Sequence, residues 1–292
     1  MTYEIRDPFA KLIGMHIEEI GETSVTTSVV LQPAHLNPYN IAHGGVAYSM
    51  GCITAQLAGK LCRGREMEVE SAACQYLSAM ATAPVRCRAE LVENTACRVE
   101  VWDGAGTLCF LQIIGLRPVE PLSESVPERA RTIFPAGPDA PVDPVTGIAY
   151  PCPASGGGFE RLTHIYIMGR EENVTRMGTD ILTETSDSRG AAHCGLIYTC
   201  CDTGIGVTGR MMGKNGVTVS SAIRYIRPAV VGPVFVETTC VRDGNTIMYF
   251  EAMVTDGNGD PVAVGQFTLH PMKVLKDKEQ AIVEAMEKKG EI

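Results

Sequence analysis

The feature that most constrains the fold of this chain is an internal repeat. Residues 99–118 read VEVWDGAGTLCFLQIIGLRP and residues 252–271 read AMVTDGNGDPVAVGQFTLHP; each holds two strand-like runs, an Asp-Gly turn between them and a final proline. The offset is 153 residues at these turns and 150 residues between His43 and His193. A nearly constant offset over separate features indicates a duplication, which predicts two copies of one structural unit.

Each copy is predicted to run from a leading strand through a loop into one long helix, followed by three or four antiparallel strands. In the first copy, SVTTSVVLQP (residues 24–33) is rich in the β-branched residues that favour strands. The segment GGVAYSMGCITAQLAGKLC (residues 44–62) has no polar stripe, so we expect a helix that is buried nearly all round. The turns at Asp103 and Asp256 are predicted to close hairpins.

A stretch rich in proline and glycine separates the two copies and predicts a linker, because neither residue sustains regular structure. The expected domain boundaries are therefore a first unit at residues 1–118, a linker at residues 119–158 and a second unit at residues 159–292.

Composition and charge exclude several classes of function. The net charge of −9 argues against a nucleic-acid-binding surface, which is normally basic. The 11 cysteines include no CxxC pair and are scattered through apolar runs, which indicates reduced, buried thiols in a cytoplasmic protein and no zinc site. The N-terminal segment lacks the apolar core of a signal peptide, and no uncharged apolar run approaches the ~20 residues of a membrane span.

A single carboxylate stands out in DSRGAAHCGLIYTCCDTG (residues 187–204), which reads as an apolar helix of small residues. Asp202 lies in its middle, where a charge is costly unless it is paired or used. A catalytic carboxylate is one interpretation; the other is that Asp202 binds a buried backbone group. The matching segment NPYNIAHGGVAYSMGCIT (residues 37–54) has Cys52 at the equivalent position.

The start of the first long helix has the features of a site for a developing negative charge. A helix N-terminus presents unpaired N–H groups at the positive end of its dipole. His43, Gly44 and Gly45 open this helix, and a glycine lets a substrate oxygen approach the backbone. Asn37 lies six residues before His43 and is able to supply a side-chain N–H beside it.

These motifs, together with DPFAKLIG in the first copy and RYIRPA in the second, resemble the PaaI-type acyl-CoA thioesterases of the hotdog superfamily. The resemblance implies an α+β fold of two tandem hotdog units, each a long central helix wrapped by a curved antiparallel sheet, that form a pseudo-dimer within one chain. It also implies hydrolysis of acyl-CoA, with CoA as part of the substrate and no separate cofactor or metal. Such tandem chains pair further in some relatives, so a homo-oligomer is expected as a possibility.

The resemblance further implies that each catalytic site spans both units. Asn37, His43 and Gly44 match the side that binds the thioester oxygen, whereas Asp202 and Thr218 match the acid and a hydroxyl that helps hold the attacking water. The sequence leaves open whether Asp202 is a general base or a nucleophile, and whether His43 orients the loop or only caps the helix.

The second composite site is predicted to be degenerate. It pairs Cys52 with Asp187, His193 and Cys194, so the acid is missing and an Asp replaces the Asn. An Asp there would repel developing negative charge. A nucleophilic Cys52 is the alternative, but no charged neighbour in the sequence lowers its pKa.

Cations follow both long helices at similar offsets. Lys60 and Arg63 follow the first helix, and Arg210 and Lys214 follow the second. They are candidates to hold the phosphates of CoA, although cations at helix C-termini also complement the dipole without any ligand.

Two other functions remain open at this stage. One is a non-catalytic hotdog protein that binds acyl-CoA as a sensor. The other is a hotdog hydratase or dehydratase, which pairs a His with a carboxylate in a different loop-helix layout.

Overall fold

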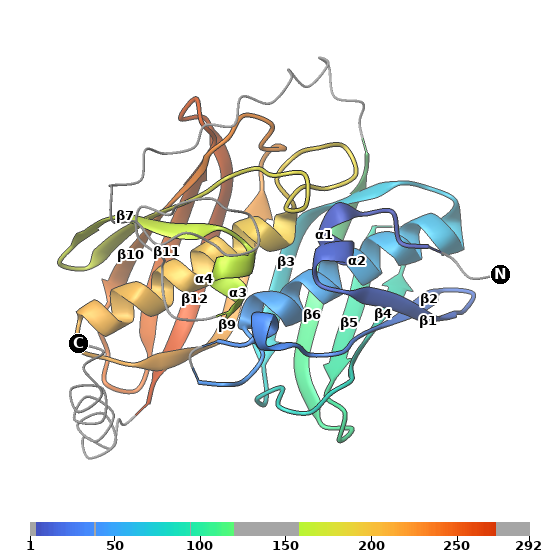
Figure 1. Cartoon of the computed structure of the whole chain (residues 1–292), viewed down its shortest axis with the longest axis horizontal. Coiled ribbons are helices and arrows are strands. Elements are labelled where there is room, and N and C mark those ends of the chain that lie inside the picture. The colour runs from blue at the N-terminus through green and yellow to red at the C-terminus, as the bar shows by residue number, and fades with distance from the viewer. Residues whose placement is uncertain (1–3, 38, 94, 120–157, 273–292) are drawn as a thin grey trace.

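The two halves of the chain repeat one order of elements (Figure 1). This computed structural model describes residues 4–37, 39–93, 95–119 and 158–272. The first half contains α1 (Pro8–Leu12), β1 (Met15–Ile20), β2 (Ser24–Val29), η1 (Pro33–His35), α2 (Gly44–Arg63), β3 (Met67–Tyr76), β4 (Val85–Val92), β5 (Ala96–Trp102) and β6 (Leu108–Pro118). The second half contains α3 (Gly158–Leu162), β7 (Ile165–Glu171), β8 (Val174–Thr179), α4 (Cys194–Met211), β9 (Gly216–Tyr225), β10 (Val234–Arg242), β11 (Met248–Thr255) and β12 (Pro261–Pro271).

The strands of the two halves form one sheet of 12 strands in the order β1-β2-β4-β5-β6-β3-β9-β12-β11-β10-β8-β7. The halves join where β3 pairs antiparallel with β9, in a register that runs from Ser71 opposite Arg224 to Gln75 opposite Ser220. The order of equivalent strands is the same when read from either edge. The repeat seen in the sequence is therefore present as a repeat in the topology.

The long helices α2 and α4 lie on the same face of the curved sheet (Figure 1). Each begins after a histidine whose Nδ1 accepts a hydrogen bond from the backbone N–H two residues later. Every residue of α2 from Gly45 to Ala55 is buried, which confirms the expectation of a helix without a polar face. The helix ends at Gly64, whose φ of 67° is a left-handed conformation that glycine adopts without strain.

Small residues let the N-terminal halves of α2 and α4 pack closely. A Cβ atom on Gly45 would lie 2.2 Å from Thr199 Oγ1, and one on Gly195 would lie 2.1 Å from Ser49 Oγ. The rings of Tyr48 and Tyr198 stack between the helices with centroids 3.6 Å apart. As a result, the start of each helix lies beside the middle of the other, which positions both composite sites.

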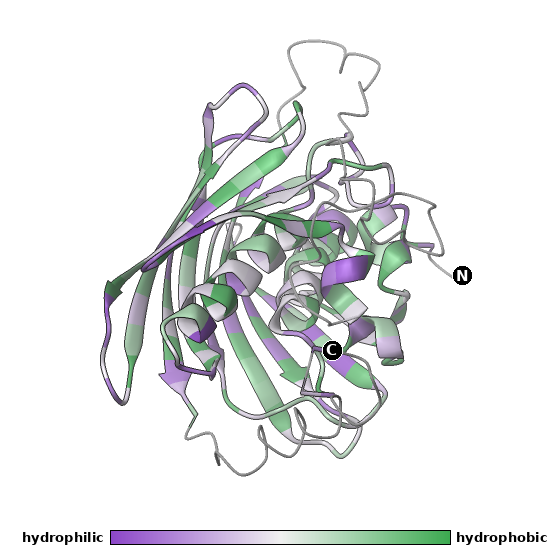
Figure 2. Ribbon diagram, turned by 60° about the vertical axis from the view of Figure 1, so that its left-hand side comes forward, coloured by the Kyte–Doolittle hydropathy of each residue, from purple (hydrophilic) through white to green (hydrophobic). Residues whose placement is uncertain are grey.

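Buried and exposed residues alternate along β4 and β11. The colours of Figure 2 show that hydrophobic and hydrophilic residues also alternate along strands of the sheet. This alternation is expected of a sheet that packs on helices with one face only. Both predicted hairpins are confirmed: β5 pairs with β6 around Asp103, and β11 pairs with β12 around Asp256. In each turn the Asp Oδ1 accepts hydrogen bonds from two backbone N–H groups.

The predicted linker, residues 119–158, lies outside the described residues except at its two ends. The predicted boundaries of the two units remain a prediction.

Candidate active site

Asp202 lies in the middle of α4, with only 10% of its side chain exposed. Its Oδ1 accepts a hydrogen bond of 2.6 Å from Thr218 Oγ1 on β9. Burial raises the pKa of the Asp202 carboxyl above its usual range; His43 and the Thr218 hydrogen bond oppose this shift, and the nearby Glu160 adds to it. The result is a stronger base than an exposed carboxylate, with Oδ2 on the side away from Thr218.

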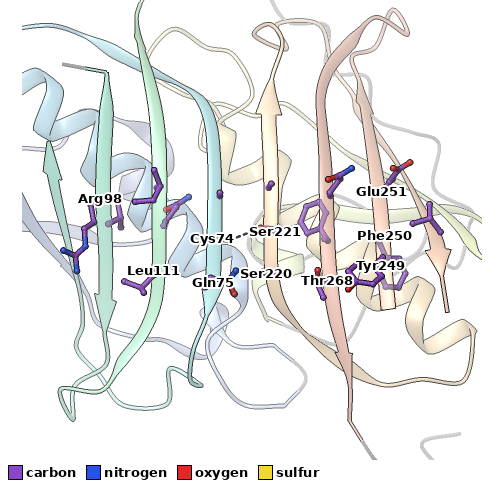
Figure 3. A pocket seen from close by; sticks show the side chains of 18 residues that line it. Cys74, Gln75, Arg98, Leu111, Ser220, Ser221, Tyr249, Phe250, Glu251 and Thr268 are labelled. Atoms are coloured by element: carbon purple, nitrogen blue, oxygen red, sulfur yellow. Dashed lines mark hydrogen bonds between the residues drawn. The ribbon is translucent and has the colours of Figure 1, made fainter. Parts of the chain in front are cut away.

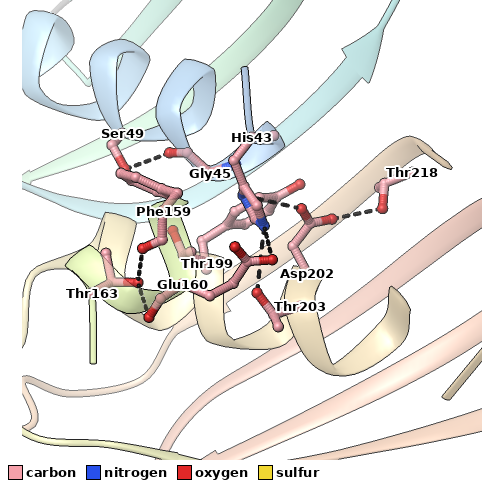
Figure 4. Close-up of polar contacts among 12 residues, drawn as sticks. His43, Gly45, Ser49, Phe159, Glu160, Thr163, Thr199, Asp202, Thr203 and Thr218 are labelled. Carbon is pink, nitrogen blue, oxygen red and sulfur yellow. Dashed lines mark hydrogen bonds and ion pairs between the residues drawn. The ribbon is translucent and has the colours of Figure 1, made fainter. Parts of the chain in front are cut away.

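His43 lies between two carboxylates at the start of α2 (Figure 4). Its Nδ1 accepts a hydrogen bond of 3.0 Å from the Gly45 N–H and lies 3.8 Å from Asp202 Oδ2. Its Nε2 lies 3.7 Å from Glu160 Oε1 and 3.4 Å from Thr203 Oγ1. Because Nδ1 accepts a hydrogen bond, the proton of the neutral ring is on Nε2.

Gly44 brings the first amide of α2 to Asp202. A Cβ atom at this position would lie 3.0 Å from Asp202 Oδ2 and 3.0 Å from the hydroxyl of Tyr76, so any side chain would fill the space between them. The Tyr76 hydroxyl donates a hydrogen bond of 2.9 Å to the Gly44 carbonyl. No acceptor for the Gly44 N–H occurs within the described part of the chain. The amide is therefore available to an oxygen atom of a ligand.

Asn37 lies in the loop before α2 and lines the same cavity. Its Oδ1 accepts hydrogen bonds from the backbone N–H groups of Tyr39, at 2.9 Å, and Ile41, at 3.4 Å. These contacts fix the carbonyl end of the side chain. The amide nitrogen, which has no acceptor among the residues described, is left as a donor.

These residues surround one cavity of about 310 Å³ between the two halves of the chain. Of the five predicted catalytic residues, the structure brings all to its wall: Asn37, His43, Gly44, Asp202 and Thr218. The remainder of the wall is largely apolar and includes Ile41, Tyr76, Leu77, Met80, Val217 and Leu269. A polar end with a carboxylate and free N–H donors, joined to an apolar wall, suits a ligand with a reactive carbonyl and an apolar tail.

Sequence reasoning missed Glu160 as a residue of this site. Glu160 is in the short helix α3, is 4% exposed and lines the cavity beside His43. A signal was present, because GFERL (residues 158–162) aligns with PFAKL (residues 8–12) and gives Ala10 as its counterpart. A charge that replaces a buried alanine between repeats points to a specific role.

The second composite site keeps the histidine, as His193, but differs at the positions of Asn37, Gly44, Asp202, Thr218 and Glu160. Cys52 is fully buried, and the Nε2 of Gln112 donates to its Sγ at 3.7 Å. The hydrogen bond with Cys52 is the larger cause that raises the pKa of the Cys194 thiol, and burial raises this pKa further. Asp187 makes the same turn contacts as Asn37 and also pairs with Arg189 at 3.2 Å. The hollow at this site has a volume of only about 50 Å³.

Among the predicted phosphate-binding cations, only Arg210 lines the cavity of Asp202. Lys214 pairs with Asp243 on the surface. Lys60 and Arg63 lie in the last turn of α2, at the opposite end of that helix from Gly44. The structure therefore does not bring these two residues to the site.

A larger hollow, of about 700 Å³, lies on the face of the sheet away from the helices (Figure 3). It crosses the junction of β3 and β9, where Cys74 Sγ and Ser221 Oγ form a hydrogen bond of 2.8 Å. Exposed side chains such as Ile113 and Tyr249 line it. The described residues that line it are all on strands, so its carboxylate, Glu251, has no helix N-terminus beside it, and the larger volume does not make it a better candidate active site.

Two negative observations apply to the described residues alone. They contain no group of three or more His, Cys, Asp or Glu side chains arranged to hold a metal ion. None of their helices combines the length and the apolar character that crossing a bilayer requires.

Comparison with known proteins gives one family match. A family model described as Thioesterase superfamily matches residues 189–263, which include Asp202 and Thr218. No curated protein matches the sequence significantly.

Solved structures with low sequence identity share the fold over nearly the whole chain. A protein of unknown function with a hotdog fold from Alicyclobacillus acidocaldarius has a TM-score of 0.62 at 11% identity, over 93% of this chain and 100% of its own. A provisionally assigned thioesterase II from Thermobifida fusca has a TM-score of 0.60 at 12% identity, over 94% of this chain and 100% of its own. The tesB protein of Mycobacterium avium subsp. paratuberculosis has a TM-score of 0.58 at 13% identity, over 91% of this chain and 98% of its own. The chain therefore has a hotdog fold and is similar to thioesterases.

Proposed function

We propose that this protein hydrolyses an acyl-CoA thioester to the free acid and CoA at one composite site between two tandem, PaaI-type hotdog units. The observation that carries the proposal is that Asp202, from the second half, lies beside Gly44 of the first half, whose N–H has no acceptor among the described residues. Among the cavities formed by the described residues, the one of about 310 Å³ alone combines these groups, so one working site per chain is expected.

The oxygen of the thioester carbonyl would lie against the Gly44 N–H and the Asn37 side-chain amide. Negative charge develops on this oxygen during attack, and donors fixed before the reaction stabilise it. The positive end of the α2 dipole adds to this stabilisation. His43 contributes indirectly, because it takes up the Gly45 N–H and leaves the Gly44 N–H for the substrate.

Asp202 would act from the opposite side of the carbonyl. As a general base, its Oδ2 removes a proton from water while the water oxygen bonds to the acyl carbon, and the C–S bond then breaks to release CoA, whose sulfur takes up a proton. As a nucleophile, Oδ2 bonds to the acyl carbon, the C–S bond breaks to release CoA, whose sulfur takes up a proton, and water then hydrolyses the acyl-Asp202 anhydride to the free acid. Thr218 holds Oδ1 in either case, and both routes remain open.

The CoA part of the substrate is proposed to leave the cavity past Arg210, which is exposed and lines its wall. Its guanidinium group is able to pair with a phosphate. No cofactor beyond the substrate is proposed. The ten free cysteines of the described residues accord with the proposed cytoplasmic location, and further pairing of chains into an oligomer remains a proposal.

The structure disfavours a hydratase with His43 as its base. A base needs a free ring nitrogen, but Nδ1 of His43 already accepts the Gly45 N–H and Nε2 carries the proton. The imidazole is thus a helix cap within the site.

The proposed function is tested by release of free thiol from a panel of acyl-CoA esters, with Asp202→Asn and Cys52→Ala as matched variants. Loss of a general base or nucleophile typically costs on the order of 10²- to 10⁴-fold, so Asp202→Asn is expected to abolish measurable turnover. Cys52→Ala is expected to stay within a few-fold of the wild type. Tight binding of the esters without thiol release would favour a sensor, and equal losses in both variants would contradict the assignment of the working site.

A further inference from the structure

Four polar side chains occur at the Asp202 site and are replaced by less polar ones at the equivalent positions of the second site. The repeat pairs Glu160 with Ala10, Asp202 with Cys52, Thr203 with Ile53 and Thr218 with Val69. Asp202 and Thr218 already have roles in the proposed hydrolysis. Glu160 differs between the sites in the same way, yet it has no role so far.

Glu160 is not required to build this part of the fold. At the second site His193 caps α4 as His43 caps α2, and its Nδ1 accepts the Gly195 N–H at 3.0 Å. The His193 ring stacks on Phe9, and its Nε2 has no hydrogen-bond partner in the described part of the chain. A histidine cap therefore forms without a carboxylate at position 10, so the buried Glu160 needs another explanation.

The explanation lies in the tautomer of His43. Asp202 Oδ2 lies 3.8 Å from Nδ1, and its charge favours a proton on that nitrogen. Such a proton would face the Gly45 N–H, which would lose its acceptor, and it would be attracted to Oδ2, the atom that acts in the proposed hydrolysis. Glu160 Oε1, 3.7 Å from Nε2, favours the proton on the opposite nitrogen and so offsets the effect of Asp202 (Figure 4).

We propose that Glu160 is a positioning residue, whose carboxylate keeps the proton of His43 on Nε2 and thereby leaves Oδ2 of Asp202 free to accept a proton from water. The second site needs no such residue, because it has no carboxylate at position 52. The kinetic part of this proposal rests on the proposed thioesterase function, but the position of the proton is measurable without any turnover.

Glu160 also acts on Asp202 directly through its charge, which raises the pKa of the Asp202 carboxyl together with burial. His43 also faces Asp202. The other ionisable side chains around Asp202 are all buried and protonated, because burial raises the pKa of each: Cys74, Tyr76, Tyr198 and Cys201. Removal of the Glu160 charge should therefore lower the pKa of Asp202 and move the acidic limb of the rate profile to lower pH.

The experiment compares Glu160→Leu, which removes the acceptor, with Glu160→Gln, which removes only the charge. Glu68→Gln is the matched control, since Glu68 is a buried carboxylate of the second site. The ¹⁵N signals of the imidazole rings, with His43 assigned by substitution, report which nitrogen carries the proton. We expect a proton on Nε2 in the wild type and the control, and an increased population with the proton on Nδ1 in Glu160→Leu.

Kinetics on an acyl-CoA ester give the second readout. Because a misplaced catalytic group costs on the order of tenfold to a hundredfold, kcat should fall by this factor in Glu160→Leu while KM stays within about twofold. In Glu160→Gln the acidic limb should move to lower pH. A wild type without activity would reject the proposed function alone, because the ¹⁵N signals still decide the role of Glu160.

The proposal is overturned if the His43 tautomer is the same in the wild type and in both Glu160 variants. If Glu160→Leu does not fold, as judged by its thermal transition, Glu160→Gln decides through the His43 signals and the pH profile. An unchanged tautomer and an unchanged acidic limb in that variant would also overturn the proposal.

Discussion

The two composite sites have nearly the same backbone and differ in what fills the space between the helices. At the first site, Gly44 and Asp202 face each other across a cavity of about 310 Å³. At the second, Cys194 and Cys52 occupy these positions, and the hollow has a volume of only about 50 Å³. The comparison shows that the shared fold alone does not set the size of the cavity, which instead depends on the residue at the start of one helix and the residue in the middle of the other.

The second site is closed by ion pairs as well as by cysteines. Arg189 pairs with Asp187 and with Glu68, and Arg117 pairs with the other oxygen of Glu68 at 2.6 Å. The side chain of Arg189 is only 20% exposed. Charges that would face a ligand at an open site are thus matched with each other, which converts the position into a structural contact between the halves.

After Asp202→Asn and its counterpart Cys52→Ala, the largest expected effect that separates the sites is at the glycine. Gly44→Ala places a methyl group 3.0 Å from Asp202 Oδ2, in the space proposed for the thioester. The N–H of residue 44 remains, but the methyl group should keep the thioester carbonyl from reaching it, so we expect kcat/KM for an acyl-CoA ester to fall by on the order of 10²-fold, the loss that is typical for an oxyanion donor. The control is Cys194→Ala at the equivalent position, which should stay within about twofold. Equal losses in the two variants would show that the second site also works.

A smaller effect is expected at the cations that follow the helices. Arg210→Ala should raise KM for acyl-CoA by roughly three- to tenfold with little change in kcat, because a partly exposed charged contact contributes on the order of 1 kcal/mol. Lys60→Ala, at the equivalent position after α2, should leave both constants unchanged. The measurement is KM as a function of ionic strength, and a KM for Arg210→Ala that matches the wild type at low salt would remove Arg210 from the substrate path.

The smallest expected effect is on stability, and its sign differs between the two sites. Burial raises the pKa of Asp202 in the folded state, so its contribution to stability is greatest below its unfolded pKa and is lost as pH rises through the folded pKa. Asp202→Asn should therefore raise the free energy of unfolding at neutral pH by on the order of 1 kcal/mol, which corresponds to a rise in Tm of roughly 2 °C. The rise should be smaller in acid. Asp187→Asn should lower Tm, because it removes the charge that pairs with Arg189. The check is thermal unfolding of both variants at neutral and acidic pH, and a lower Tm for Asp202→Asn would mean that its charge is compensated.

The parts of the fold that were predictable are those with a local or repeated signal. The two hairpins at Asp103 and Asp256, and the buried character of α2, follow from turn residues and from the absence of a polar face. Asp202 was recognisable because a charge in an apolar helix is costly and because the repeat offers Cys52 for comparison.

The remaining features depend on contacts between distant segments. Glu160 is over 100 residues from His43, and although the repeat aligns α3 with α1, nothing in the sequence near Glu160 predicts that the fold brings it to His43. Arg189 has an ordinary loop sequence around it, and only the pairing of the halves brings it to Glu68. Lys60 and Arg63 lie in the last turn of α2, at the end of the helix that is far from Gly44. The similar spacing of cations in the two copies did not reveal this distance from the site.

The most direct test of the central claim is a structure with a 2-oxoalkyl-CoA thioether, which keeps a carbonyl but has no thioester bond to hydrolyse. The account predicts one ligand per chain, with its carbonyl oxygen hydrogen-bonded to the Gly44 N–H and its chain in the cavity beside Asp202. A ligand bound at Cys194 and Cys52, or a carbonyl that points away from Gly44, would contradict it.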